Sequence, residues 1–221
     1  MTIALTGFMG CGKSHVAACI AGKTGGFFFD LDDTIQIGEG LSVSEIFETQ
    51  GEAAFRLLEL EYLDRIICDY AGFPTDMVLS LGGGTILTPQ CAELIKKNAV
   101  CVYLRASVDE LVRNLEITGI EHRPVLAGTD DLHGSVAALL AKRAPVYEKT
   151  ADIIIDVDGL SFDEVADRII AATDNLPIRT DILFRSYLIF SGRNRNKSAA
   201  GVPSPSEEDS SPHKSANLGL P

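Results

Sequence analysis

The chain has 221 residues, and 46% of them are hydrophobic, so it is long enough for one substantial domain with a packed core and too short for two large ones. Its formal net charge is −12, from 19 basic and 31 acidic side chains, which makes nucleic acid a poor expectation as a partner. No apolar run approaches the about 18 to 20 residues of a membrane span, and the first residues already have a strand pattern, so we expect no signal peptide, no membrane partner and a cytoplasmic protein.

Short apolar segments alternate with longer segments of helical periodicity along most of the chain. The expected strands lie at residues 2–6, 27–29, 77–81, 99–104 and 152–156, and the first two are expected to be buried. The expected helices lie at residues 14–23, 42–67, 89–97, 107–117, 132–149 and 161–173. Gly51 interrupts the second of these helices, so two helices or a bend are expected there. This alternation predicts a three-layer α/β/α sandwich with a five-stranded parallel sheet.

The end of the chain differs in composition from the rest. Residues 176–221 carry six basic and four acidic side chains, whereas residues 1–175 carry 13 and 27 and therefore have a net charge of −14. Ser, Pro, Asn and Gly dominate after Gly192, although residues 182–190 are apolar enough for one short helix. We therefore expect one domain at 1–175 and a mostly disordered extension at 176–221.

The stretch Gly7 to Ser14 matches the phosphate-binding pattern G-x-x-x-x-G-K-[ST] and follows the first strand directly. Backbone N–H groups of such a loop point at phosphates, and the helix after it directs its positive end at them. Lys13 would reach the β- and γ-phosphates of ATP, and the Ser14 hydroxyl would bind Mg²⁺. The expected fold is therefore that of a P-loop NTPase, similar to the nucleoside monophosphate kinases.

Two further groups of residues follow strands at the same edge of the expected sheet, where ligands of open α/β sheets bind. Asp30 and Asp32 end the second strand, and one carboxylate could serve the metal while the other orients a hydroxyl and accepts its proton. The alternative is that they cap the next helix. Gly82, Gly83 and Gly84 follow the third strand, and three glycines in a row favour close approach of a ligand over a simple tight turn.

Because residues 1–175 have a net charge of −14, the few arginines among them are candidates for binding an anionic ligand. Arg123 precedes Pro124 in a Gly- and Thr-containing loop at 118–130, which could be a lid that brings a guanidinium to the transferred phosphate. Arg56 lies among glutamates on its helix, so an ion pair on a solvated face is the alternative, and Arg143 alone would be assigned to the surface. Neither the four histidines nor the five cysteines have the spacing of a metal site, so we expect free thiols.

Taken together, these motifs resemble those of the shikimate kinase family over residues 1–175. The segments that carry the resemblance are Gly7 to Ser14, Phe29 to Asp32, Gly51 to Arg56, Leu81 to Gly84, Arg123 to Leu126 and Lys142 to Tyr147. The resemblance implies transfer of the γ-phosphoryl group of ATP, with Mg²⁺, to the 3-hydroxyl of shikimate. It also implies substrate-binding helices at about 33–62, a lid at about 118–130 and, as we expect, a monomer.

The resemblance assigns a role to each matching residue. It implies that Asp32 is the base, that Arg56 and Arg143 hold the substrate carboxylate, and that Arg123 lies over the phosphates as the lid arginine. The implied catalytic residues are Asp32, Lys13 and Arg123. The implied ATP-binding residues are Gly10, Cys11, Gly12, Lys13, Ser14, His15, Arg113 and Arg123. The implied substrate-binding residues are Asp32, Arg56, Gly82, Gly83, Gly84 and Arg143. The implied metal ligands are Ser14 and Asp30.

The chain departs from the family pattern on the adenine side. A further arginine commonly lies several residues before the lid arginine, but Glu116 falls close to that place and Arg113 is the nearest candidate. Two alternatives to a shikimate kinase stay open at this point. One is another small P-loop kinase, for gluconate or a nucleoside monophosphate, and the other is a non-catalytic ATP-binding switch.

Overall fold

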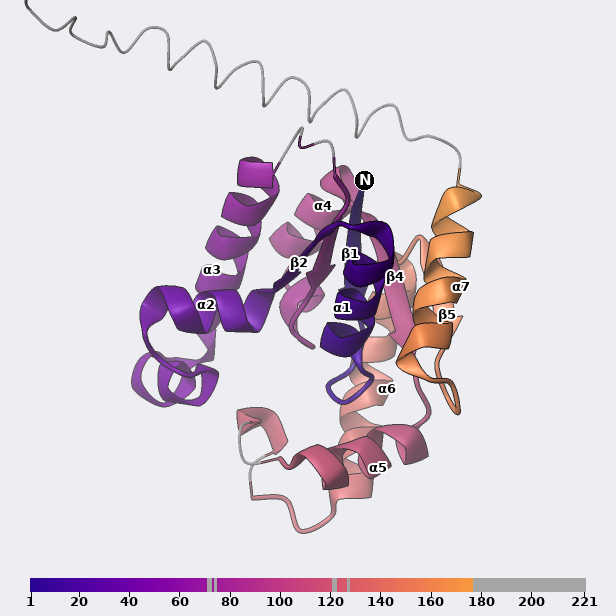
Figure 1. The fold of residues 1–221 in the computed structure, drawn as a ribbon. Helices are drawn as coiled ribbons and strands as arrows, with labels where there is room; N and C mark the ends of the chain where they lie inside the picture. The colour runs from indigo at the N-terminus through magenta and orange to yellow at the C-terminus, as the bar shows by residue number, and fades with distance from the viewer. Residues whose placement is uncertain (71–72, 74, 121–122, 127, 177–221) are drawn as a thin grey trace, which may run out of the picture.

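The computed structural model describes residues 1–176 except 71–72, 74, 121–122 and 127, and it has the layered architecture that the alternation predicts (Figure 1). The residues from 177 onward lie outside the described part. The expected short helix at 182–190 and the expected disorder of the extension therefore stay predictions.

The central layer is one sheet of five parallel strands in the order β2-β3-β1-β4-β5. Its strands are β1 (Thr2–Thr6), β2 (Phe27–Asp30), β3 (Met77–Ser80), β4 (Val100–Arg105) and β5 (Ile153–Asp156). In the middle strand, Leu5 pairs with Ser80 on one side and with Val102 on the other. The carboxyl ends of β1 and its neighbours therefore lie next to one another.

Helices cover both faces of the sheet. They are α1 (Lys13–Thr24), α2 (Leu31–Glu39), α3 (Val43–Tyr70), α4 (Pro89–Asn98), α5 (Val108–Thr118), α6 (Leu132–Thr150) and α7 (Phe162–Asp174), with short 3-10 turns η1 (Thr85–Leu87) and η2 (Pro124–Leu126). Figure 1 shows α1 and α7 side by side on one face and α4 and α6 on the other. In the described residues, no helix is both long and apolar enough to span a membrane.

The prediction of an interruption at Gly51 is confirmed, because this residue has φ 83° and ψ 167° inside α3 and separates two helical segments. The expectation that the second strand is buried is wrong. Phe27 is 41% and Phe28 is 36% exposed, because β2 is an edge strand with one neighbour. An apolar run in the sequence predicts a strand, but whether that strand is buried depends on its place in the strand order.

Candidate active site

A cleft of about 710 Å³ opens at the carboxyl ends of β1, β2 and β3, which is where ligands of open α/β sheets bind. Most of the residues proposed from sequence line this cleft. They are Gly10, Gly12, Lys13, Ser14, His15, Asp30, Asp32, Arg56, Gly82, Gly83, Gly84, Arg123 and Arg143. Cys11 and Arg113 do not line it. Segments from across the sequence thus meet in one cavity.

The phosphate loop is ordered by its own backbone. Gly10 and Gly12 have φ of 85° and 89°, a region that favours glycine, and Gly12 caps α1 without any side-chain hydrogen bond to the first-turn amides. The buried Lys13 ammonium donates to the carbonyls of Gly7 at 3.1 Å and Phe8 at 3.0 Å. The loop therefore presents N–H groups at a helix N-terminus together with a fixed positive charge, which is an anion-binding arrangement.

Asp30 connects the phosphate loop to α2. Its Oδ2 accepts a hydrogen bond from the Ser14 hydroxyl at 2.5 Å, and its Oδ1 caps α2 by accepting from the amides of Asp32 at 3.0 Å and Asp33 at 3.3 Å. The alternative of helix capping is thus correct for Asp30, but only for one of its two oxygens.

A hydroxyl and a carboxylate in contact are hard oxygen ligands, which fit Mg²⁺. Among the described residues, no three His, Cys, Asp or Glu side chains gather as a metal cluster. A magnesium ion at Ser14 and Asp30 would therefore take its other ligands from phosphate oxygens and water, as this ion usually does.

Asp32 lies at the first turn of α2 with its carboxyl directed into the cleft beside Gly82. Its Oδ1 is buried and has no hydrogen-bond partner in the described part of the chain. Burial raises the pKa of this carboxyl to about 7, and the negative charges of Asp30 and Glu59 act in the same direction. A buried acceptor without a partner is costly unless a ligand supplies one.

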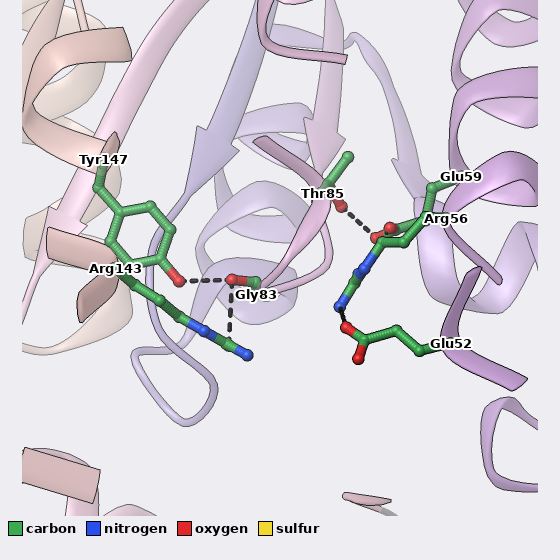
Figure 2. A network of polar contacts seen from close by, with 7 residues as sticks. All are labelled: Glu52, Arg56, Glu59, Gly83, Thr85, Arg143 and Tyr147. Atoms are coloured by element: carbon green, nitrogen blue, oxygen red, sulfur yellow. Dashed lines mark hydrogen bonds and ion pairs between the residues drawn. The ribbon is translucent and has the colours of Figure 1, made fainter. Parts of the chain in front are cut away.

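Arg56 belongs to a network of charged and polar side chains on one wall of the cleft, in which Glu59 and Thr85 are fully buried (Figure 2). Its guanidinium donates to Glu59 at 2.6 Å and to Glu52 at 2.8 Å, and the second oxygen of Glu59 accepts from the Thr85 hydroxyl at 2.6 Å. Burial opposes the charge of Arg56, but the two glutamates outweigh it, and its pKa is raised. The alternative expectation, an ion pair on a solvated helix face, is wrong for the pair of Arg56 with Glu59, because Glu59 is 0% exposed.

Arg143 lies on α6 and faces Arg56 from the opposite wall (Figure 2). Its Nη1 donates to the Gly83 carbonyl at 3.3 Å, and the hydroxyl of Tyr147, one helical turn further on, donates to the same oxygen. Arg143 is 6% exposed, so its expected assignment to the surface in isolation is wrong. The glycine loop thus lies between the two arginines.

The three glycines make room for side chains of the site itself. A Cβ on Gly82 would come within 2.7 Å of Asp32 Oδ1, and a Cβ on Gly84 would come within 2.5 Å of both terminal nitrogens of Arg56. At Gly83 the nearest atom to such a Cβ is 3.4 Å away. The first and third glycines therefore let the charged groups beside them keep their positions, in addition to any approach of a ligand.

Arg123 reaches the cleft from the segment between α5 and α6. Its Nη2 donates to the Thr118 hydroxyl at 3.3 Å, whereas its Nη1 is buried without a partner in the described residues. Burial lowers the pKa of this guanidinium. A guanidinium whose buried Nη1 has no acceptor among the described residues is suited to receive an anion in the cleft.

The remaining residues proposed for ATP lie less centrally. Arg113 is exposed on α5 and forms an ion pair with Glu110, and the buried Cys11 lies 3.9 Å from Lys13 Nζ. His15 lines the cleft with its ring stacked on Phe162 at 4.8 Å. The structure thus leaves the contacts to adenine as a prediction.

Sequence reasoning missed three residues of the networks. Glu59 is three positions after Arg56, a spacing that indicates an ion pair on a helix but not its burial. Tyr147 is four positions after Arg143, so the two were predictable as neighbours on one helix face. Thr85 had no such signal, because its partner is 26 residues away.

The family model of shikimate kinase matches residues 9–174, which is more than half of the chain. The shikimate kinase of Chlorobaculum parvum is 39% identical over 164 residues, covering 71% of this chain and 83% of that protein. The enzyme of Thermodesulfovibrio yellowstonii is 37% identical over 174 residues, covering 79% of this chain and 95% of that protein.

Solved structures agree with these similarities. The shikimate kinase from Acinetobacter baumannii in complex with shikimate has a TM-score of 0.71 at 28% identity, covering 80% of this chain and 95% of that one. The shikimate kinase from Bacteroides thetaiotaomicron has a TM-score of 0.70 at 32% identity, covering 79% of this chain and 98% of that one.

Proposed function

Since the chain belongs to the shikimate kinase family and transfers the γ-phosphoryl group of ATP to the 3-hydroxyl of shikimate, we propose how the residues of its cleft divide this work. The proposal has a donor half, built on the phosphate loop, and an acceptor half, built on Asp32, Arg56 and Arg143. Both halves line the same cavity.

In the donor half, the uncapped amides at the start of α1 and the ammonium of Lys13 hold the phosphates of ATP. Arg123 supplies a second cation at the transferred group, where negative charge must be stabilised as the bond to the leaving oxygen breaks. Mg²⁺, when bound through Ser14 and Asp30, neutralises charge on the phosphate oxygens.

In the acceptor half, Arg56 and Arg143 bind the carboxylate of shikimate. A guanidinium presents two parallel N–H donors to a carboxylate, which fixes the orientation of the ring as well as its position. Asp32 Oδ1 then accepts the hydrogen of the 3-hydroxyl and takes its proton during transfer.

One observation carries this division of roles. Two buried polar atoms of the cleft, Asp32 Oδ1 and Arg123 Nη1, have no partner in the part of the chain that the structure describes. One can accept a hydroxyl hydrogen and the other can receive a phosphate oxygen, so the pair matches an alcohol acceptor and a phosphoryl donor.

The test is a coupled assay of ADP release with shikimate, gluconate and nucleoside monophosphates side by side. Of these acceptors, we expect only shikimate to be turned over. Chelation of Mg²⁺ with excess EDTA should abolish this turnover. Turnover with gluconate or a monophosphate at a comparable rate would overturn the assignment of the acceptor half. The same enzyme with Lys13→Ala is the control for a contaminating kinase.

The organisation around the cleft is part of the proposal. The catalytic domain spans 1–175, with substrate-binding helices at about 33–62 and a lid at about 118–130, and the protein acts as a cytoplasmic monomer. The cleft supports the extent of the domain, because the residues that line it come from Met9 to Phe162. Light scattering together with specific activity that is independent of protein concentration tests the monomer.

A further inference from the structure

The carbonyl oxygen of Gly83 is bound twice by α6, through Arg143 Nη1 at 3.3 Å and through the hydroxyl of Tyr147 (Figure 2). Tyr147 is 0% exposed and does not line the cleft, so it cannot touch a substrate. Its ring packs against Tyr103, with ring centroids 5.2 Å apart. A hydroxyl held by so fixed a ring is a rigid donor.

The peptide between Gly83 and Gly84 lies inside a turn closed by the Thr85 N–H and the Gly82 carbonyl at 3.2 Å, and the contacts from α6 fix which way its own carbonyl points. Three consecutive glycines have wide conformational freedom, and no side chain resists rotation of this peptide. Because the bond is trans, a carbonyl directed at α6 turns the N–H of Gly84 the opposite way, toward the wall that carries Arg56. Within the described residues neither the Gly83 nor the Gly84 amide has a hydrogen-bond acceptor.

The same anchor affects Arg143. Only one N–H of its guanidinium is used on Gly83, and the others stay available in the cleft. If the carbonyl turned away from α6, Arg143 would lose the contact that orients it. Burial raises the pKa of Tyr147, so its hydroxyl keeps its proton and donates throughout the working pH range.

We propose that Tyr147 is a positioning residue for shikimate, acting through the Gly83 carbonyl to hold the loop amides and the Arg143 guanidinium toward the substrate carboxylate. This inference rests on the proposed function of the acceptor half. It predicts an effect on shikimate binding that leaves the ATP side unchanged, because no atom of the phosphate loop contacts Tyr147 through a hydrogen bond in the described chain.

The experiment is steady-state kinetics of Tyr147→Phe, which removes one hydroxyl and keeps the ring. We expect the KM for shikimate to rise roughly 10-fold, the size expected when a buried carbonyl loses a hydrogen bond, whereas kcat and the KM for ATP change by less than about two-fold. The matched control is Thr173→Val, which removes another buried hydroxyl with one hydrogen bond, to the Ile170 carbonyl at 2.9 Å; it lies on α7, outside the cleft lining, and should leave both KM values unchanged.

A second measurement separates positioning from general stability. Shikimate should raise the melting temperature of Tyr147→Phe less than that of the wild type, even if the variant starts from a lower value. In the Arg143→Ala background, Tyr147→Phe should add much less to the KM than it does alone, because both act on one carbonyl.

Three results would overturn the inference: an unchanged shikimate KM, equal losses in both KM values and kcat, or additive effects with Arg143→Ala. These results differ from failure of the proposed function itself. In that case the wild-type enzyme would not turn over shikimate at all.

Discussion

The donor and acceptor halves of the cleft are built in different ways. The donor half is built around one contiguous stretch, Gly7 to Ser14, whose main contacts are made by or to the backbone, and Asp30 and Arg123 complete it. The acceptor half is assembled from α2, α3, the glycine loop and α6, and its contacts are charged side chains bound to one another or to Gly83. A local sequence motif is enough to form the phosphate loop of the donor half, whereas the acceptor half forms only when the complete fold brings its elements together.

The difference teaches where each half is vulnerable. In the donor half, a change of backbone conformation does the damage, because positive φ angles shape the loop. In the acceptor half the danger is an unbalanced buried charge, because the fully buried Glu59 carboxylate is neutralised by the partly buried Arg56. Substitutions in the two halves should therefore fail differently.

The largest effect is expected where the halves meet, at Asp32. Asp32→Asn removes the proton acceptor and keeps the shape, so kcat should fall by about 10²- to 10⁴-fold, while the dissociation constant for ATP stays nearly unchanged. Asp174→Asn, exposed at the end of α7 and outside the cleft lining, is the control and should retain full activity. A near-normal kcat in Asp32→Asn, measured in the coupled assay, would remove Asp32 from the chemistry.

Glycine substitutions should separate the halves. Gly84→Ala places a Cβ within 2.5 Å of the Arg56 guanidinium and should raise the KM for shikimate about 10-fold or more with little change for ATP. Gly12 has φ 89°, and a Cβ there would lie 2.8 Å from the Phe162 ring. Gly12→Ala should therefore raise the KM for ATP and leave the KM for shikimate nearly unchanged.

Gly83→Ala is the matched control within the glycine loop, because its Cβ would meet no atom closer than 3.4 Å. It should be milder than Gly84→Ala. Equal defects at both positions would show that the glycines serve the ligand rather than the neighbouring side chains.

A smaller effect, on stability, is expected at Thr85. Thr85→Val leaves one oxygen of the fully buried Glu59 without its donor, which should lower the free energy of unfolding by about 1–3 kcal/mol. For a domain of this size that corresponds to a fall in Tm of roughly 2–4 °C per kcal/mol. Thr85→Ser keeps the hydroxyl and should unfold near the wild-type temperature in calorimetry. If both variants unfolded alike, the hydrogen bond would not be the stabilising feature.

The smallest effect is expected at Arg113, the sequence-based candidate for the adenine side. Its ion pair with Glu110 is exposed on α5 and outside the cleft lining. Arg113→Ala should therefore change the KM for ATP by less than about two-fold, as is common for exposed pairs. A rise of 10-fold or more would instead place this arginine on the nucleotide and support the expectation from sequence.

The sequence was most informative where structure is local. The phosphate loop, its strand and its helix are consecutive, so motif and context could be checked together, and the interruption at Gly51 follows from one residue. The exposure of Phe27 and Phe28 could not be predicted, because it depends on β2 being at the edge of the sheet. Strand order is a property of the whole fold.

The same limit applies to the site. Three strand ends indicated the edge at which residues meet, and Asp32 and the glycine loop could be named in advance. The burial of Glu59 and its bond to Thr85 could not, since periodicity does not say which face of a helix is covered by a loop 26 residues further along. Spacing predicts neighbours within an element, and long-range packing decides what surrounds them.

The close fit between the glycine loop and its neighbours has a consequence for how this sequence can diverge. A Cβ at position 82 would lie 2.7 Å from Asp32 Oδ1, and one at position 84 would lie 2.5 Å from the Arg56 guanidinium, so a side chain at either position displaces the charged group that the cleft uses. Substitution histories should therefore show paired exchanges, 82 with 32 and 84 with 56, rather than independent drift. A lineage that gave up the arginine would be released from the glycine, and its acceptor could then differ in chemical class.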